Sequence, residues 1–137
     1  MTPFHLALPV DDLDAARAFY STLLGCREGR CAPAWVDFDF FGHQLSVHLR
    51  PEEVSTARTN PVDGDDVPVR HFGLVLPWAD WQALHTRLAG AGVRFLLAPR
   101  VRFAGEIGEQ GTFFVQDPAG NALEFKTFRD PSRLFAS

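Results

Sequence analysis

The feature that most constrains the fold is an internal repeat that spans most of the chain. The segment that starts His5-Leu-Ala-Leu resembles the one that starts His71-Phe-Gly-Leu, and each leads into a helix-like stretch that ends in Gly. The helix positions Leu13, Ala16, Phe19, Leu23 and Gly25 correspond in order to Trp78, Trp81, Leu84, Leu88 and Gly90. Such a repeat indicates two copies of one supersecondary unit that bury their apolar faces together.

Strands are predicted where apolar and polar residues alternate, and helices where apolar residues recur every three to four positions. The first copy has the order β-α-β-β-β, with elements at about 4–10, 13–24, 26–30, 35–40 and 43–50. The second copy has the same order, with elements at about 71–76, 78–90, 93–97, 112–116 and 122–127. Asp11 and Asp12 provide an N-cap for the first helix, and Gly25 ends it.

These elements predict an α+β fold in which residues 1–137 form a single domain of two βαβββ modules. Its parts are module 1 (about 4–50), a linker without regular structure (51–68), module 2 (about 69–127) and a C-terminal tail (128–137). One helix covers only one face of a four-stranded sheet, so the other face needs a partner. We therefore expect the modules to form a curved mixed sheet around a shared cavity.

Composition excludes several classes of function. The net charge is −4 and the 13 basic residues are scattered along the chain, which argues against nucleic acid as a partner. No stretch approaches the roughly 18 apolar residues of a membrane span, and the N-terminus lacks the pattern of a signal peptide. Cys26 and Cys31 do not make a disulfide framework. The expected location is the cytoplasm, with no membrane partner.

Three potential metal ligands are predicted to face away from the helices. Side chains alternate along a strand, so His5 lies opposite the apolar set that must contact the first helix. His71 holds the same place in the second copy, and Glu124 lies opposite Leu123 and Phe125 on the last strand. Two imidazoles and one carboxylate predict a site for a divalent metal.

Each of these residues also has a structural interpretation. A single strand histidine is more often a hydrogen-bonded core or surface group than a ligand, but the repeat places two at equivalent positions. A buried Glu124 requires a cation, which a metal, Lys126 or an arginine can provide. We favour the metal over the salt bridge.

The chain resembles the vicinal oxygen chelate superfamily, which includes glyoxalase I, extradiol dioxygenases, fosfomycin-modifying thiol transferases and bleomycin resistance proteins. The resemblance covers nearly the whole chain and is carried by the strands at His5 and His71, by DLDAARAFYSTLLG and, most specifically, by DPAGNALEFK. It implies metal ligands on the first and fourth strands of each module, and His5, His71 and Glu124 occupy three of these four positions.

The fourth position is Ser46, which follows Gly42 by the same spacing as Glu124 follows Gly120. The resemblance implies a second carboxylate there in glyoxalase I, so Ser46 disfavours that activity. Two histidines and one carboxylate with open positions suit Fe(II) and oxygen. His48 lies on the same face as Ser46, and we assign it a catalytic role in proton transfer. Alternatively, His48 is a fourth metal ligand, forms a hydrogen bond with the substrate, or is a surface histidine without a role in the site.

The sequence therefore predicts a metal-dependent enzyme that binds a small molecule, with extradiol dioxygenase-like ring cleavage of a catechol-type vicinal diol as the preferred reaction. Fe(II) is the preferred cofactor, with Mn(II), Ni(II) or Zn(II) as alternatives, and a homodimer is expected. Two other functions stay open: a glyoxalase-type isomerase, epimerase or thiol transferase at the same metal site, and a metal-free binding or resistance protein.

Overall fold

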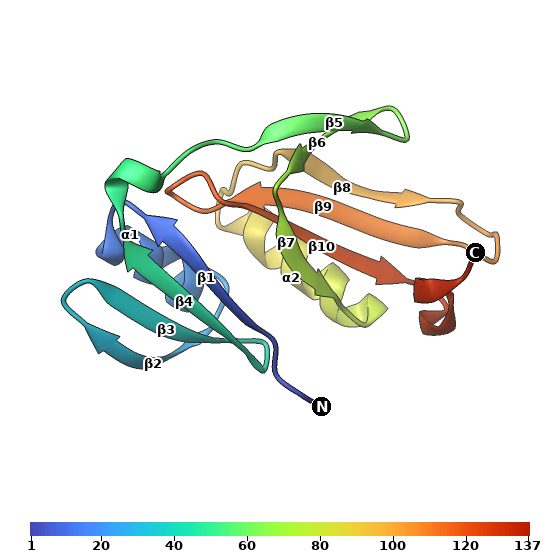
Figure 1. The fold of residues 1–137 in the computed structure, drawn as a ribbon. Coiled ribbons are helices and arrows are strands. Elements are labelled where there is room, and N and C mark those ends of the chain that lie inside the picture. The colour runs from blue at the N-terminus through green and yellow to red at the C-terminus, as the bar shows by residue number, and fades with distance from the viewer. The chain divides into compact units, whose positions relative to one another are not determined.

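The computed structural model describes all 137 residues, which divide into two units that each contain one copy of the repeat. Unit 1 comprises Met1–Ala57 together with Asp117–Asn121, and unit 2 comprises Arg58–Gln116 together with Ala122–Ser137. Figure 1 shows the strands of unit 1 in blue to green and those of unit 2 from green to red. A short turn of the second copy, Asp117–Asn121, thus belongs to the unit formed by the first.

Alternating apolar residues build a four-stranded sheet in unit 1. Its strands are β1 (His5–Val10), β2 (Arg27–Ala32), β3 (Trp35–Phe40) and β4 (His43–Leu49). They lie in the order β1-β4-β3-β2, with β1 parallel to β4 and the other neighbours antiparallel. The residues between β3 and β4, Phe41 and Gly42, both have positive φ, as a tight two-residue hairpin requires.

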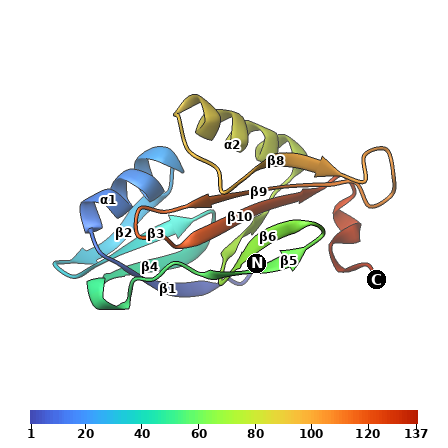
Figure 2. The same ribbon diagram turned by 90° about the horizontal axis from the view of Figure 1, so that it is seen from above.

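One face of this sheet is covered by the helical segment that follows β1 (Figure 2). The predicted cap is confirmed, because the Asp12 side chain accepts a hydrogen bond from the backbone N–H of Ala15 over 3.0 Å. The helix α1 (Leu13–Arg17) then continues as the π-helical segment η1 (Ala18–Leu23) and not as the single α-helix that the spacing predicts. Tyr20 in η1 is fully buried.

Unit 2 repeats this arrangement with β7 (Phe72–Val75), α2 (Trp78–Gly90), β8 (Leu97–Arg102), β9 (Gln110–Gln116) and β10 (Ala122–Phe128). The strand order is β7-β10-β9-β8, and β7 is parallel to β10. Helix α2 covers one face of the sheet (Figure 2), where the buried indole of Trp81 donates from Nε1 to the carbonyl oxygen of Phe125 over 2.9 Å. The α+β prediction of two βαβββ modules with mixed sheets is confirmed.

The segment 51–68 is not the unstructured linker that its Pro and Gly content predicts. It contains the 3₁₀ turn η2 (Pro51–Glu53) and strand β5 (Arg58–Val62), which pairs antiparallel with β6 (Asp65–Val69). Asp63 and Gly64 form the connecting turn with φ values of 50° and 88°. Two adjacent residues with positive φ are typical of a tight hairpin, and a two-stranded ribbon tolerates its prolines because both strands are edges.

Three other features differ from the prediction: the bounds of two strands and the structure of the tail. The strand expected at about 93–97 begins only at Leu97 and continues to Arg102, with an irregular register against β9. His71 lies one residue before β7 and not within it. The tail contains a 3₁₀ segment, η3 (Pro131–Phe135). None of the helices is long and apolar enough to span a membrane.

Candidate metal centre

Glu124 lies on the face of the unit 2 sheet opposite α2, as alternation along β10 predicts. Its neighbours Leu123 and Phe125 are fully buried, whereas the Glu124 side chain is 14% exposed. Glu124 pairs with Gly73 on β7, and a Cβ atom at residue 73 would overlap the carbonyl oxygen of Glu124. Glycine therefore allows the close approach of β7 to β10 that brings the His71 region beside the carboxylate.

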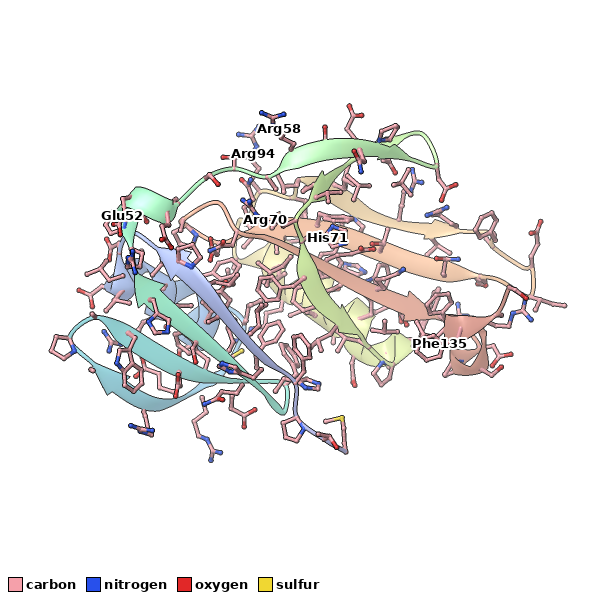
Figure 3. All side chains as sticks on the ribbon, viewed as in Figure 1. Glu52, Arg58, Arg70, His71, Arg94 and Phe135 are labelled. Atoms are coloured by element: carbon pink, nitrogen blue, oxygen red, sulfur yellow. The ribbon has the colours of Figure 1, made fainter.

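His71 contacts Glu124 directly. Its Nε2 atom lies 3.1 Å from Glu124 Oε2, and its Nδ1 atom lies 2.5 Å from the carbonyl oxygen of Pro68. The ring of Phe114 packs against the imidazole edge to face, with 5.0 Å between ring centroids. Figure 3 shows His71 where the chain enters β7. Of the three predicted ligands, the structure thus brings two together.

This geometry leaves the His71–Glu124 contact in need of a cation. A carbonyl oxygen only accepts hydrogen bonds, so the hydrogen of a neutral His71 ring belongs on Nδ1, which faces Pro68. Nε2 then presents a lone pair to Glu124 Oε2, and two acceptors oppose each other at 3.1 Å. Either a proton on Nε2 or a metal ion satisfies both atoms.

The donor set fits a divalent metal. Adjacent ligand atoms that are each about 2.1 Å from an octahedral ion lie about 3 Å apart, and the 3.1 Å between His71 Nε2 and Glu124 Oε2 agrees with this spacing. The Nδ1 contact with a backbone carbonyl is the outer partner that metal-binding histidines usually have. His71 and Glu124 therefore form a suitable half of a metal centre.

Thr112, which is not among the predicted site residues, holds the other oxygen of the carboxylate. Its Oγ1 atom donates to Glu124 Oε1 over 2.9 Å from the neighbouring strand β9. The carboxylate is thereby fixed with Oε2 toward His71. The only signal in the sequence is a hydroxyl residue at a polar position of an otherwise apolar strand.

His5, the third predicted ligand, belongs to unit 1, where it is the exposed first residue of β1. Within unit 1, its imidazole forms no hydrogen bond or ion pair. Within each unit, no three His, Cys, Asp or Glu side chains gather closely enough to hold a metal ion. The convergence of His5 with His71 and Glu124 stays a prediction.

Strand pairing supports the equivalence of Ser46 and Glu124. Ser46 pairs with Ala7, which is two residues after His5, and Glu124 pairs with Gly73, which is two residues after His71. Ser46 is buried, and its Oγ atom donates to Asp37 Oδ1 over 2.5 Å. Unit 1 thus carries its carboxylate on β3, a position that sequence reasoning missed although Asp37 alternates with apolar residues there.

His48 lies on the same face of unit 1, beside Pro9 on one strand and Trp35 on the other. Its side chain is exposed and forms no hydrogen bond or ion pair. Both ring nitrogens are therefore available to a bound molecule. His43, in contrast, accepts a hydrogen bond from the backbone N–H of Phe4 at Nδ1 over 2.8 Å.

A buried polar network in unit 1 fixes the turn that precedes β10. Asp117 Oδ2 accepts hydrogen bonds from the Tyr20 hydroxyl over 2.7 Å and from Asn121 Nδ2 over 2.8 Å. Asn121 Nδ2 also donates to the carbonyl oxygen of Pro9. Burial raises the pKa of Asp117 above its ordinary value of 3.8, although its hydrogen bonds oppose this shift. Burial, followed by the charge of Asp117, raises the pKa of Tyr20 well above 10.0.

A hollow of about 290 Å³ lies elsewhere in unit 1, at the end of the hairpin between β3 and β4. Its lining includes Cys26, Arg27 and Asp39, and it contains none of the predicted site residues. The Arg27 and Asp39 side chains are 3.6 Å apart and form an exposed ion pair. The two charged residues that line the hollow therefore pair with each other, and the hollow adds nothing to the metal centre.

Known proteins share the fold of this chain. The sequence profile of the Glyoxalase/Bleomycin resistance protein/Dioxygenase superfamily matches residues 2–125. A glyoxalase/bleomycin resistance protein/dioxygenase structure from Alicyclobacillus acidocaldarius is 37% identical, with a TM-score of 0.77 over 98% of this chain and 96% of that one. A search of curated proteins found no match.

Two more distant structures share the fold. The genomically encoded fosfomycin resistance protein FosX from Listeria monocytogenes is 17% identical, with a TM-score of 0.71 over 98% of both chains. Lactoylglutathione lyase from Agrobacterium tumefaciens is 24% identical, with a TM-score of 0.66 over 99% of this chain and 97% of that one. These relatives have different activities, so the likeness to them indicates the fold and not the reaction.

Proposed function

Because the chain belongs to the glyoxalase/bleomycin resistance protein/dioxygenase superfamily, we propose that it is a metal-dependent enzyme that cleaves the ring of a catechol-type vicinal diol. Proteins of this superfamily bind small molecules and commonly hold a divalent metal. The proposed ligands are His5, His71 and Glu124, and the proposed ion is Fe(II). The single observation that supports this most is the contact of His71 Nε2 with Glu124 Oε2 over 3.1 Å.

The choice of reaction depends on the number of protein ligands. Ser46 stands where a fourth ligand would lie, and its hydroxyl is already engaged by Asp37. Three protein ligands leave open positions, which suits a bidentate diol together with oxygen. When bound, Fe(II) would supply Lewis-acid binding of the two vicinal oxygens and redox chemistry with O₂.

The residues of the chain have separate roles in this proposal. Thr112 keeps Glu124 oriented through the hydrogen bond to Oε1, and Pro68 keeps the Nε2 atom of His71 free of hydrogen. An imidazole nitrogen of His48 takes the proton of a substrate hydroxyl, for which an exposed ring without a partner is suited. The buried ring of Phe114 contacts His71 and excludes water from one side of it.

Oxygen consumption with a panel of catechols tests the reaction. Purified protein reconstituted anaerobically with Fe(II) is expected to consume one O₂ for each catechol whose ring opens. His48→Gln should retain the metal but lose most of the turnover. Reconstitution with Mn(II) or Ni(II), assayed with an α-ketoaldehyde hemithioacetal or an epoxide plus thiol, tests the isomerase and thiol transferase alternatives. Ring-intact catechol under Fe(II) would contradict the proposal.

Two further proposals concern the state of the protein in the cell. Neither cysteine forms a disulfide, and Cys26 is buried while Cys31 is exposed, which accords with a reducing cytoplasm. We also propose a homodimer, which sedimentation velocity tests directly. A monomer at all concentrations would contradict it.

A further inference from the structure

Lys126 is the single lysine among the 13 basic residues of the chain, the other 12 being arginines. It lies on β10 two residues after Glu124, and therefore on the same face of the unit 2 sheet. Lys126 is half-buried, and Thr112 lies directly across from it on β9. The position places an ammonium group on the face that carries the metal-binding pair.

No carboxylate of the chain forms an ion pair with Lys126. Glu124, the nearest acid along the strand, has its two oxygens engaged by Thr112 and His71. The ammonium lies over the ring of Phe128, whose centroid is 5.7 Å from Nζ.

Three arginines of unit 2 have acidic partners, whereas Lys126 has none. Arg100 pairs with Asp65, Arg102 with Asp63, and Arg129 with Glu109. An ammonium group that has no acidic partner can pair with an anion, and the attraction is stronger beside a protein surface than in bulk water. Because Lys126 lies on the face that carries the His71–Glu124 contact, its ammonium is positioned to pair with an anionic group that the ligand brings.

We propose that Lys126 binds the carboxylate of the substrate, so that the enzyme acts on an aromatic acid that also carries a vicinal diol. This inference rests on the proposed function and adds the class of substrate. Alternate residues of a strand are about 7 Å apart, so a small aromatic acid spans the distance from the Glu124 side of the face to Lys126. Lysine binds such a group as a point charge.

Zinc-loaded protein allows binding to be measured without turnover. Reductive methylation with ¹³C-formaldehyde keeps the positive charge and labels two groups, Lys126 and the N-terminus. At fixed pH, 3,4-dihydroxybenzoate is expected to shift the Lys126 resonance to saturation, whereas the neutral amide 3,4-dihydroxybenzamide is not. A charge-assisted contact should make the acid bind about 10-fold more tightly than the amide.

Variants separate charge recognition from packing. Lys126→Met keeps much of the apolar contact with Phe128 and should abolish the preference for the acid, whereas Lys126→Arg should retain most of it. The matched control is Arg94→Met, which removes an exposed cation of the same unit (Figure 3) and should leave the preference unchanged. Thermal melting of each variant verifies that it is folded.

The outcomes distinguish this inference from the proposed reaction. Equal affinity of acid and amide in the unmodified protein, an unchanged preference in Lys126→Met, or no binding of the acid overturns the role of Lys126, whatever the oxygen assay shows. A preference that depends on Lys126 without any oxygen consumption supports the substrate class and contradicts ring cleavage.

Discussion

The Tyr20 hydroxyl donates a hydrogen bond to Asp117 Oδ2 over 2.7 Å and so connects residues that are 97 positions apart. Tyr20 is fully buried in η1, and Asp117 begins the turn that leads into β10. Asp117 also accepts backbone N–H groups of that turn at Oδ1, from Ala119 and Asn121. The turn that precedes the Glu124 strand is therefore fixed by a side chain from the first copy of the repeat.

Tyr20→Phe is expected to lower the free energy of unfolding by about 1–3 kcal/mol, because it removes a buried hydrogen bond and leaves Asp117 less satisfied. Urea denaturation followed by circular dichroism measures the change. The comparison is Phe19→Leu, a buried substitution in the same segment that removes no hydrogen bond. The network is less important than we infer if Tyr20→Phe unfolds at the same urea concentration as the unaltered protein.

The contribution of Tyr20 should also depend on pH. Its pKa in the folded state is raised well above the ordinary value of 10.0, first by burial and then by the charge of Asp117. The unfolded chain therefore loses the phenolic proton first, and the stabilisation is fully present below pH 10.0 and is lost as the pH rises through the folded-state pKa. The stability of the unaltered protein relative to Tyr20→Phe should fall above pH 10.0. A constant difference up to pH 11 would argue against a buried phenol.

Gly73→Ala is expected to destabilise unit 2 by about 1–3 kcal/mol through overpacking. Its added methyl group would overlap the Glu124 carbonyl oxygen, so β7 must move away from β10 and carry His71 with it. Metal affinity should therefore fall together with stability. Gly108→Ala is the control, because no atom lies within 4 Å of the Cβ position there. Equal melting temperatures for the two variants would contradict the close approach of the strands.

Thr112→Val should weaken metal binding about 10- to 100-fold while it leaves the ligands in place, because an outer hydrogen bond orients Glu124. Isothermal titration calorimetry with Zn(II) measures the affinity. Thr127→Val removes a similar hydroxyl on β10 itself, which donates to the carbonyl oxygen of Leu76 over 2.8 Å. That control should change stability but not the affinity for zinc, and equal affinities in all three proteins would exclude a role for Thr112.

The sequence predicts the two modules well for two reasons. The internal repeat and the alternation of apolar and polar residues along each strand can both be recognised without knowledge of tertiary contacts. Alternation correctly placed Glu124 opposite Leu123 and Phe125, and the spacing after Gly42 correctly paired Ser46 with the position of Glu124. The pairing of His71 with Glu124 also agrees with their predicted common face.

The errors have physical causes. The hairpin of β5 and β6 was missed because its prolines argued against strands, although Asp63-Gly64 is a strong signal for a tight turn. Strand β8 was misplaced because Pro99 interrupts its pattern on an edge, where the missing donor is tolerated. The roles of Thr112 and Asp37 depend on contacts across strands that no local pattern encodes.

The central claim is that His5, His71 and Glu124 hold a single divalent ion, and metal titration of four single variants tests it most directly. Zinc titration by calorimetry should give one ion per chain in the unaltered protein, with affinity reduced at least about 10-fold in His5→Ala, His71→Ala and Glu124→Ala alike. His43→Ala, which removes a histidine engaged with the backbone of Phe4, should bind as tightly as the unaltered protein. Unchanged affinity in His5→Ala would contradict the account.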